Sequence, residues 1–160
     1  MKGNYLMLNG KRIDLTDEQI EKLGLEIKKE TPFDRQSYYY CILEDGVVDG
    51  RADVRDVIDD RCYNIANYCT DKSLMQQRAL HEVLDRLLWR FSMQNDGDKI
   101  ICKKMNDVFT IMYHATQRKF IVNSMCSKYH VVYFYTEEIA QRAIDEIILP
   151  FMEEHPEFIW

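Results

Sequence analysis

The longest amphipathic pattern in the chain constrains its fold most, because it predicts a helix over residues 71–95. Apolar side chains recur there at spacings of three, four or six residues, namely Leu74, Leu80, Leu84, Leu87 and Phe91. Thr70 stands at the expected N-cap, and Asp96-Gly97-Asp98 would end the helix. About 25 residues at 1.5 Å each give about 37 Å, which is enough to span a small domain.

The N-terminal part predicts a β-hairpin followed by a short helix. Strand-like residues 5–8 and 11–15 flank Asn9-Gly10, a dipeptide that tolerates the positive φ angles of a type I′ turn. Thr16 and Gln19 have the spacing of a capping box, with Thr16 as the N-cap. The short helix that they begin has ended by Pro32.

The middle of the chain predicts strands separated by turns. Aromatic and β-branched residues favour a strand over 38–43, and turn residues follow it at 44–46 and again at Asp49-Gly50. Residues 51–61 are mostly charged and predict an exposed loop or a ragged edge. Strand-like alternation resumes over 62–69.

The last third predicts a meander that leads into a second helix. Its expected strands cover 108–113, 120–125 and 131–135, and Thr136 caps a helix that Pro150 would bend or stop. The apolar tail through Trp160 is expected to dock onto the body of the protein or onto a partner. These elements predict an α+β fold with a mostly antiparallel sheet, a repeated strand-strand-helix order, and a single domain over 1–160.

Composition points to an intracellular globular protein. Of the 160 residues, 46% are apolar and 30% are charged, which favours a buried core over disorder. No apolar run approaches the roughly 20 residues of a membrane helix, and the first residues lack the apolar stretch of a signal peptide. Five widely spaced cysteines, an odd number, favour reduced thiols. The expected localisation is therefore cytoplasmic.

Acidic residues are concentrated in two segments, although the net charge is only −6. Residues 44–60 hold seven acids against two arginines, and 137–160 hold seven acids against Arg142. The first segment is interpreted either as a solvated surface or as a docking face for a basic protein. A calcium site is disfavoured because the segment lacks the EF-hand pattern. The candidate partner-binding residues are Asp49, Asp53, Asp56, Asp59 and Asp60.

The basic residues between 99 and 128 suggest an alternative, a surface for nucleic acid. Solvated turns and strand edges explain the same residues without any such function. The candidates are Lys99, Lys103, Lys104, Arg118, Lys119 and Lys128.

No pattern in the sequence recommends catalysis or a cofactor. His81-Glu82 on the long helix begins like a zinc-protease motif, but Asp85 stands where the second histidine is needed. Cys62 and Cys69 have no zinc-ribbon spacing, and nothing orients a Cys–His pair drawn from His114, His130, Cys102 and Cys126. A non-enzymatic role without metal or cofactor is expected, and a small enzyme without a recognisable motif stays a further alternative.

Two segments carry a resemblance to known proteins. Residues 63–72 and 133–144 resemble patterns in small accessory proteins of phages and mobile elements of Gram-positive bacteria. That resemblance implies a protein that acts in the bacterial host cell and blocks host machinery, as anti-CRISPR and other anti-defence inhibitors do. The expected partner is a host protein with a basic surface, such as a defence nuclease, with no membrane involved. A homo-oligomer through the sheet edge or the Trp160 tail is compatible with this role, and a nucleic-acid or nucleotide binder is the alternative.

Overall fold

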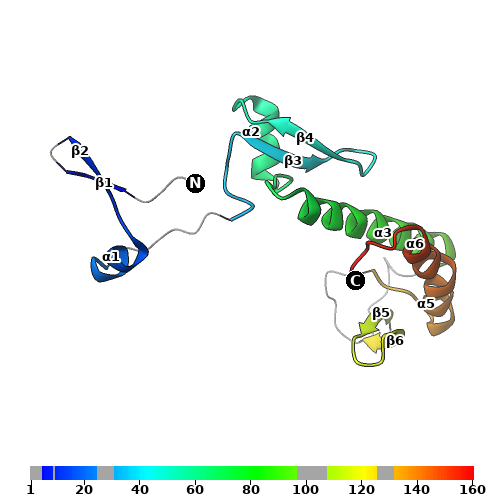
Figure 1. The fold of residues 1–160 in the computed structure, drawn as a ribbon. Helices are drawn as coiled ribbons and strands as arrows, with labels where there is room; N and C mark the ends of the chain where they lie inside the picture. The colour runs from blue at the N-terminus through cyan, green and yellow to red at the C-terminus, as the bar shows by residue number, and fades with distance from the viewer. Residues whose placement is uncertain (1–4, 9, 25–30, 97–107, 126–131) are drawn as a thin grey trace. The chain divides into compact units, whose positions relative to one another are not determined.

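In the part of the chain that the structure describes, three β-hairpins are each followed by a helix (Figure 1). The structure, a computed structural model, describes residues 5–8, 10–24, 31–96, 108–125 and 132–160. It divides into two compact units, residues 1–34 and residues 35–160. The predicted α+β class, the antiparallel pairing and the strand-strand-helix order are confirmed in these residues. The single-domain organisation stays a prediction.

The first unit contains the predicted hairpin and the predicted short helix. Strands β1 (Tyr5–Leu8) and β2 (Lys11–Asp14) are antiparallel, and Gly10 has the positive φ of 75° that the turn requires. Helix α1 covers Asp17–Lys22. The capping box is confirmed, since Gln19 N–H donates to Thr16 Oγ1 (3.3 Å) and Thr16 N–H donates to Gln19 Oε1 (2.9 Å).

The second hairpin corrects two predictions. Strands β3 (Tyr38–Ile42) and β4 (Val48–Ala52) pair with Tyr40 opposite Gly50, so the predicted turn at Asp49-Gly50 is wrong. Gly50 allows a close approach instead, because a Cβ atom there would clash with the Tyr38 hydroxyl. The predicted strand over 62–69 is wrong as well. Helix α2 covers Val57–Asn64, and only Cys69 forms a β-bridge, with Tyr40.

The long helix α3 (Lys72–Asp96) confirms the strongest sequence prediction. Its N-terminal cap lies one residue later than predicted, because Asp71 Oδ1 accepts the N–H of Leu74 (3.1 Å). No helix within the described part of the chain combines the length and the apolar character needed to cross a bilayer.

The third hairpin and the C-terminal helices follow the predicted order. Strands β5 (Val108–His114) and β6 (Lys119–Met125) are antiparallel, whereas the predicted third strand is reduced to a bridge between Phe109 and Phe134. Helix α5 (Glu137–Ala143) is capped by Thr136 as predicted. A π-helical turn, η1 (Ile144–Ile148), joins α5 to α6 (Leu149–Glu154).

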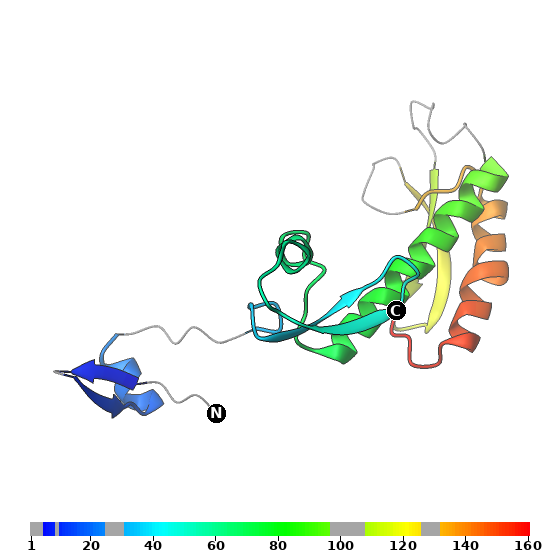
Figure 2. The same cartoon turned by 90° about the horizontal axis from the view of Figure 1, so that it is seen from above.

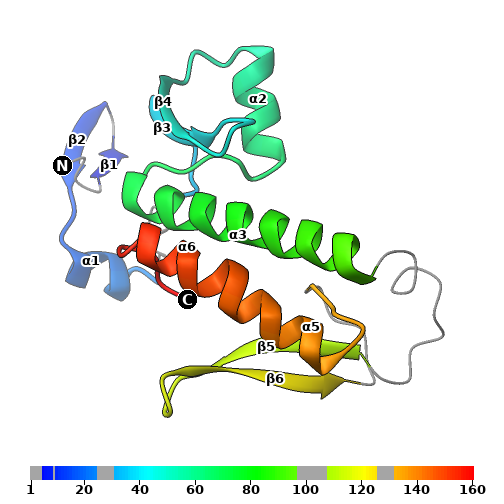
Figure 3. The same cartoon turned by 90° about the vertical axis from the view of Figure 1, so that its right-hand side faces the viewer.

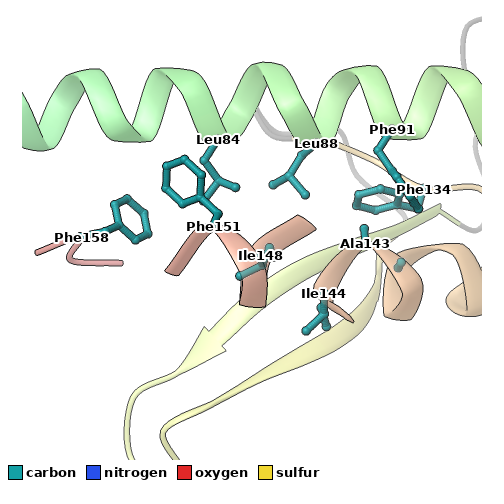
Figure 4. Packing of buried hydrophobic residues seen from close by; sticks show 10 residues of the cluster. Leu84, Leu88, Phe91, Phe134, Ala143, Ile144, Ile148, Phe151 and Phe158 are labelled. Atoms are coloured by element: carbon teal, nitrogen blue, oxygen red, sulfur yellow. The ribbon is translucent and has the colours of Figure 1, made fainter. Parts of the chain in front are cut away.

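The main core lies where α3, the α5–α6 segment and the β5–β6 hairpin meet. Figures 2 and 3 show α3 and the α5–α6 segment side by side, and α5 also contacts both strands of the hairpin. Figure 4 shows buried apolar side chains filling the space between them, among them Leu84, Leu88, Phe134, Ile148 and Phe151. The tail packs on this core through Phe158, and Trp160 lies against Phe120 with ring centroids 4.7 Å apart, so the predicted docking of the tail is confirmed.

Candidate functional site

Helix α2 exposes two apolar side chains, Val57 and Ile58, and buries a carboxylate. Val57 and Ile58 are 73% and 50% exposed, whereas Asp59 is the buried residue of this helix at 0%. A surface helix normally buries its apolar residues and exposes its charged ones. Val57, Ile58 and Asp59 of α2 show the opposite arrangement, which is called the inversion of α2. Val54, just before the helix, and Ile65, its C-cap, are also exposed, at 71% and 62%. These four residues, Val54, Val57, Ile58 and Ile65, are called the α2 patch.

Asp59 attaches α2 to the hairpin beneath it. Its Oδ1 accepts the Tyr39 hydroxyl at 2.8 Å and lies 3.4 Å from Arg51 Nε. Its Oδ2 accepts the backbone N–H groups of Val54 (2.9 Å) and Asp56 (3.2 Å). Burial opposes ionisation of this carboxyl, but the hydrogen bonds from Tyr39, Asp56 and Val54 outweigh burial and lower its pKa. Asp59 is therefore an ionised anchor for both the loop and the helix.

A second ion pair holds the loop that precedes α2. Arg35 Nε and Nη2 donate to the two carboxylate oxygens of Asp53 at 2.6 and 2.8 Å, and its Nη1 lies 2.6 Å from Asp60 Oδ1. Asp53 also accepts the N–H of Arg55 (2.9 Å) and the hydroxyl of Tyr68 (3.2 Å). The hydrogen bonds from Arg35 outweigh burial and lower the pKa of Asp53 to about 2. The same contacts raise the pKa of Arg35.

Two stacked tyrosines join the ion pairs. The rings of Tyr39 and Tyr68 are nearly parallel, with centroids 4.2 Å apart, and both side chains are buried. Burial raises the pKa of each phenol, so both remain neutral hydrogen-bond donors to aspartate. The connected group, called the aspartate frame, comprises Asp53, Asp56, Asp59 and Asp60 with Arg35, Arg51, Tyr39 and Tyr68.

The frame fixes an unusual backbone conformation. Arg55 has a φ of 61°, in the left-handed region that costs a non-glycine residue about 1 kcal/mol or more. The N–H groups of Val54, Arg55 and Asp56 are held by the carboxylates of Asp53 and Asp59. Asp56 Oδ1 also accepts the N–H groups of Ile58 and Asp59 at 2.8 Å. The loop is thereby fixed with Asp53 and Asp59 buried and the side chains of the α2 patch exposed.

Two of the five aspartates of the predicted acidic docking face are buried. The side chains of Asp53 and Asp59 are 2% and 0% exposed, so the prediction that they contact a partner is wrong. Asp56 and Asp60 are partly exposed, but each carboxylate is paired with an arginine of the frame. Asp49 is exposed and accepts the N–H of Gly50, and its contact with a partner stays a prediction.

Sequence reasoning missed the frame for an identifiable reason. Arg35, which forms ion pairs with Asp53 and Asp60, lies outside the acidic segment 44–60. The available signal was the spacing of Asp56 and Asp59, a capping box made of two aspartates. That spacing predicts a helix start in the middle of the charged run.

The alternative basic candidates are only partly within the described residues. Arg118 and Lys119 lie at the β5–β6 turn and line a cleft of about 560 Å³, opposite Asp145 and Glu153 of the C-terminal helices. Acids across the cleft make it a mixed surface rather than a basic one for phosphates. Lys99, Lys103, Lys104 and Lys128 lie outside the described residues.

The residues considered for catalysis have structural contacts. The His81 ring packs on Phe158 with centroids 4.7 Å apart, and Glu82 pairs with Arg78 and Arg86 along α3. His114 Nδ1 accepts the N–H of Gln117 (3.3 Å). His130, Cys102 and Cys126 lie outside the described residues. Across residues 5–8, 10–24, 31–96, 108–125 and 132–160, no group of three or more His, Cys, Asp or Glu side chains is placed to hold a metal ion.

The aspartate frame is expected to make stability depend on acid pH. Because the pKa of Asp53 falls from an ordinary 3.8 to about 2, the folded protein binds this proton more weakly than the unfolded chain. The contribution of the ionised Asp53 carboxylate to the free energy of unfolding is complete above about pH 5 and is lost as the pH falls through 4 towards 2. Urea unfolding of wild type and Asp53→Asn at pH 7, 5, 4 and 3 measures this contribution as a difference in the free energy of unfolding. The difference between the two proteins should shrink with acid, and a constant difference would contradict the assignment.

The site is not explained by likeness to known proteins, because comparison with protein-family models, curated proteins and solved structures finds no match.

Proposed function

We propose that this protein acts by binding another protein through the α2 patch rather than by transforming a substrate. The observation that carries the proposal is that α2 exposes Val57 and Ile58 while its buried residue is Asp59. Exposed apolar residues that lie close together are typical of protein interaction sites. The resemblance to phage and mobile-element proteins adds the expectation that the partner belongs to the host cell, a defence nuclease being one candidate.

The cost of building this surface supports a binding role. Presenting Val54, Val57 and Ile58 to water gives up the stability that their burial would supply. The protein also holds Arg55 in a strained conformation and buries two ionised carboxylates in the same segment. Such features are retained where a surface has to be held in one fixed shape for recognition.

Affinity capture with matched variants tests the proposal. The tagged protein is used to capture partners from a lysate of the cells in which it is made, alongside Val57→Ser/Ile58→Ser. Captured protein should fall about tenfold or more for this variant, because truncating central apolar contacts of an interface commonly costs more than 1 kcal/mol each. Both residues are exposed, so the thermal midpoint should stay near the wild-type value.

The control removes exposed apolar side chains elsewhere. Leu74 and Trp89 of α3 are 43% and 61% exposed, and Leu74→Ser/Trp89→Ser should capture the same proteins as wild type. Equal capture by the α2 variant and by wild type would contradict the proposal. Salt-sensitive binding of nucleic acid by the isolated protein in a gel-shift assay would instead favour the alternative through the basic residues.

A further inference from the structure

We infer that Cys41 and Cys62 form a redox site, at which a hydroperoxide converts the two thiols into a disulfide that joins strand β3 to helix α2. Both residues carry free thiols in the structure. The inference does not depend on the proposed function, because neither thiol belongs to the α2 patch.

The packing of α2 on the hairpin brings the two thiols together. Alternate residues of a strand point to opposite faces, so Tyr39 and Cys41 of β3 share one face of the hairpin. On α2, Cys62 follows Asp59 by three residues and lies on the same side of the helix. Asp59 Oδ1 accepts the Tyr39 hydroxyl at 2.8 Å, which holds the two faces against each other. Close to that anchor, Cys62 packs on the buried cluster that contains Cys41.

The two thiols also interact directly. Burial raises the pKa of Cys41 to about 11, helped by the charge of a Cys62 thiolate and by a hydrogen bond between the two side chains. Cysteines whose Cβ atoms point apart cannot be bridged without movement of the backbone. Side chains that already contact each other meet this requirement, so a disulfide can form within the packed structure.

Exposure assigns the two thiols different roles in the reaction. Cys62 is half-buried, whereas Cys41 is only 4% exposed, so a hydroperoxide in solution reaches Cys62 first. The Cys62 thiolate attacks one peroxide oxygen, the O–O bond breaks, and an alcohol leaves while Cys62 becomes a sulfenic acid. The sulfur of Cys41 then attacks the Cys62 sulfur. An S–S bond forms, the S–O bond breaks, and the hydroxyl leaves as water with the proton of Cys41. The thiol pair gives up two electrons and two protons, which reduce the hydroperoxide to an alcohol and water.

Cys69 provides a control within the same part of the chain. It is 1% exposed and belongs to a different buried cluster, which contains Ile42 and Met75. Its Sγ accepts the N–H of Asp71 at 3.4 Å. Removal of this third thiol should therefore leave the disulfide between Cys41 and Cys62 unaffected.

Peroxide treatment followed by peptide mapping tests the inference. The reduced full-length protein is treated with a small excess of hydrogen peroxide, and the remaining thiols are blocked with N-ethylmaleimide after denaturation. Mass spectrometry of a tryptic digest should find peptide 36–51 linked to peptide 62–72 in wild type and in Cys69→Ala. The link should be absent from Cys41→Ser and from Cys62→Ser, and dithiothreitol should remove it from wild type.

Thermal unfolding of the oxidised protein is the second measurement. The thermal midpoint should rise by about 5 °C on oxidation and return on reduction, because a disulfide between the two residues restricts the unfolded chain. Cys62→Ser should show no rise after the same peroxide treatment.

Several outcomes would overturn the inference. These are oxidation of Cys62 to a sulfinic or sulfonic acid without a link, a link from Cys62 to any cysteine other than Cys41, and a link between two molecules. If Cys69→Ala does not fold, fragmentation of the linked wild-type peptides identifies the cysteine that is bound to Cys41. A linked protein whose thermal midpoint is unchanged or lower would also contradict the inference, because the bond would then require a different packing of α2 on β3.

Discussion

Asp59→Asn is expected to lower the thermal midpoint by about 10 °C, since breaking a buried ion network by removing one partner is among the costliest single changes. Each oxygen of Asp59 accepts two contacts, Oδ1 from Tyr39 and Arg51 and Oδ2 from the backbone of Val54 and Asp56. An asparagine amide turns one acceptor into a donor that faces other donors, whichever way it is oriented. Differential scanning calorimetry of the variant measures the effect.

The matched control is Asp49→Asn, an exposed aspartate of the same acidic segment. Its thermal midpoint should stay within about 2 °C of wild type. Both substitutions remove one negative charge, so the comparison separates the role of Asp59 as an anchor from a general effect of charge. Equal shifts for the two variants would show that the frame does not support the fold.

Ile148→Ala is expected to cost about 3 kcal/mol and to lower the thermal midpoint by about 10 °C. Ile148 is 0% exposed in the core between α3, the α5–α6 segment and the β5–β6 hairpin. The truncation leaves a cavity because helices on one side and a hairpin on the other limit how far the site can collapse. Urea unfolding monitored by circular dichroism gives the free energy of unfolding.

Leu149→Ala is the control for this substitution. Leu149 is the next residue in the chain, yet its side chain is 44% exposed beside the cleft near Arg118. Its free energy of unfolding should change by less than about 1 kcal/mol. A similar decrease in the free energy of unfolding for the two variants would mean that Ile148 is not buried in the core.

Patterns of local spacing in the sequence predicted most of the fold. Three confirmed predictions depend on contacts within a few residues: the long helix, the capping box at Thr16 and the N-cap at Thr136. Gly50 shows where local reasoning fails. A glycine in a strand and a glycine in a turn look alike in sequence, and only the approach of Tyr38 distinguishes them.

The candidate site could not be predicted from charge counting. A run of aspartates on a solvated surface and a run neutralised from within have the same composition, and the difference lies in Arg35, which is 25 residues before Asp60 in the chain. Tyr39 and Tyr68 were part of predicted strands, with no signal that their hydroxyls bind carboxylates. Contacts between residues 15 to 25 positions apart in the sequence depend on how the β3–β4 hairpin and α2 pack together, which local sequence patterns do not specify.

Attachment of α2 through Asp59 has a consequence for how this protein could change its target. Most surface helices depend on their apolar residues for stability, so altering those residues to suit a new ligand weakens the fold. In α2 the two tasks fall on different residues, because the carboxylates hold the helix while Val57, Ile58, Arg61 and Ile65 contribute little to its anchoring. The outer positions can therefore be randomised in a directed-evolution library while the scaffold stays folded.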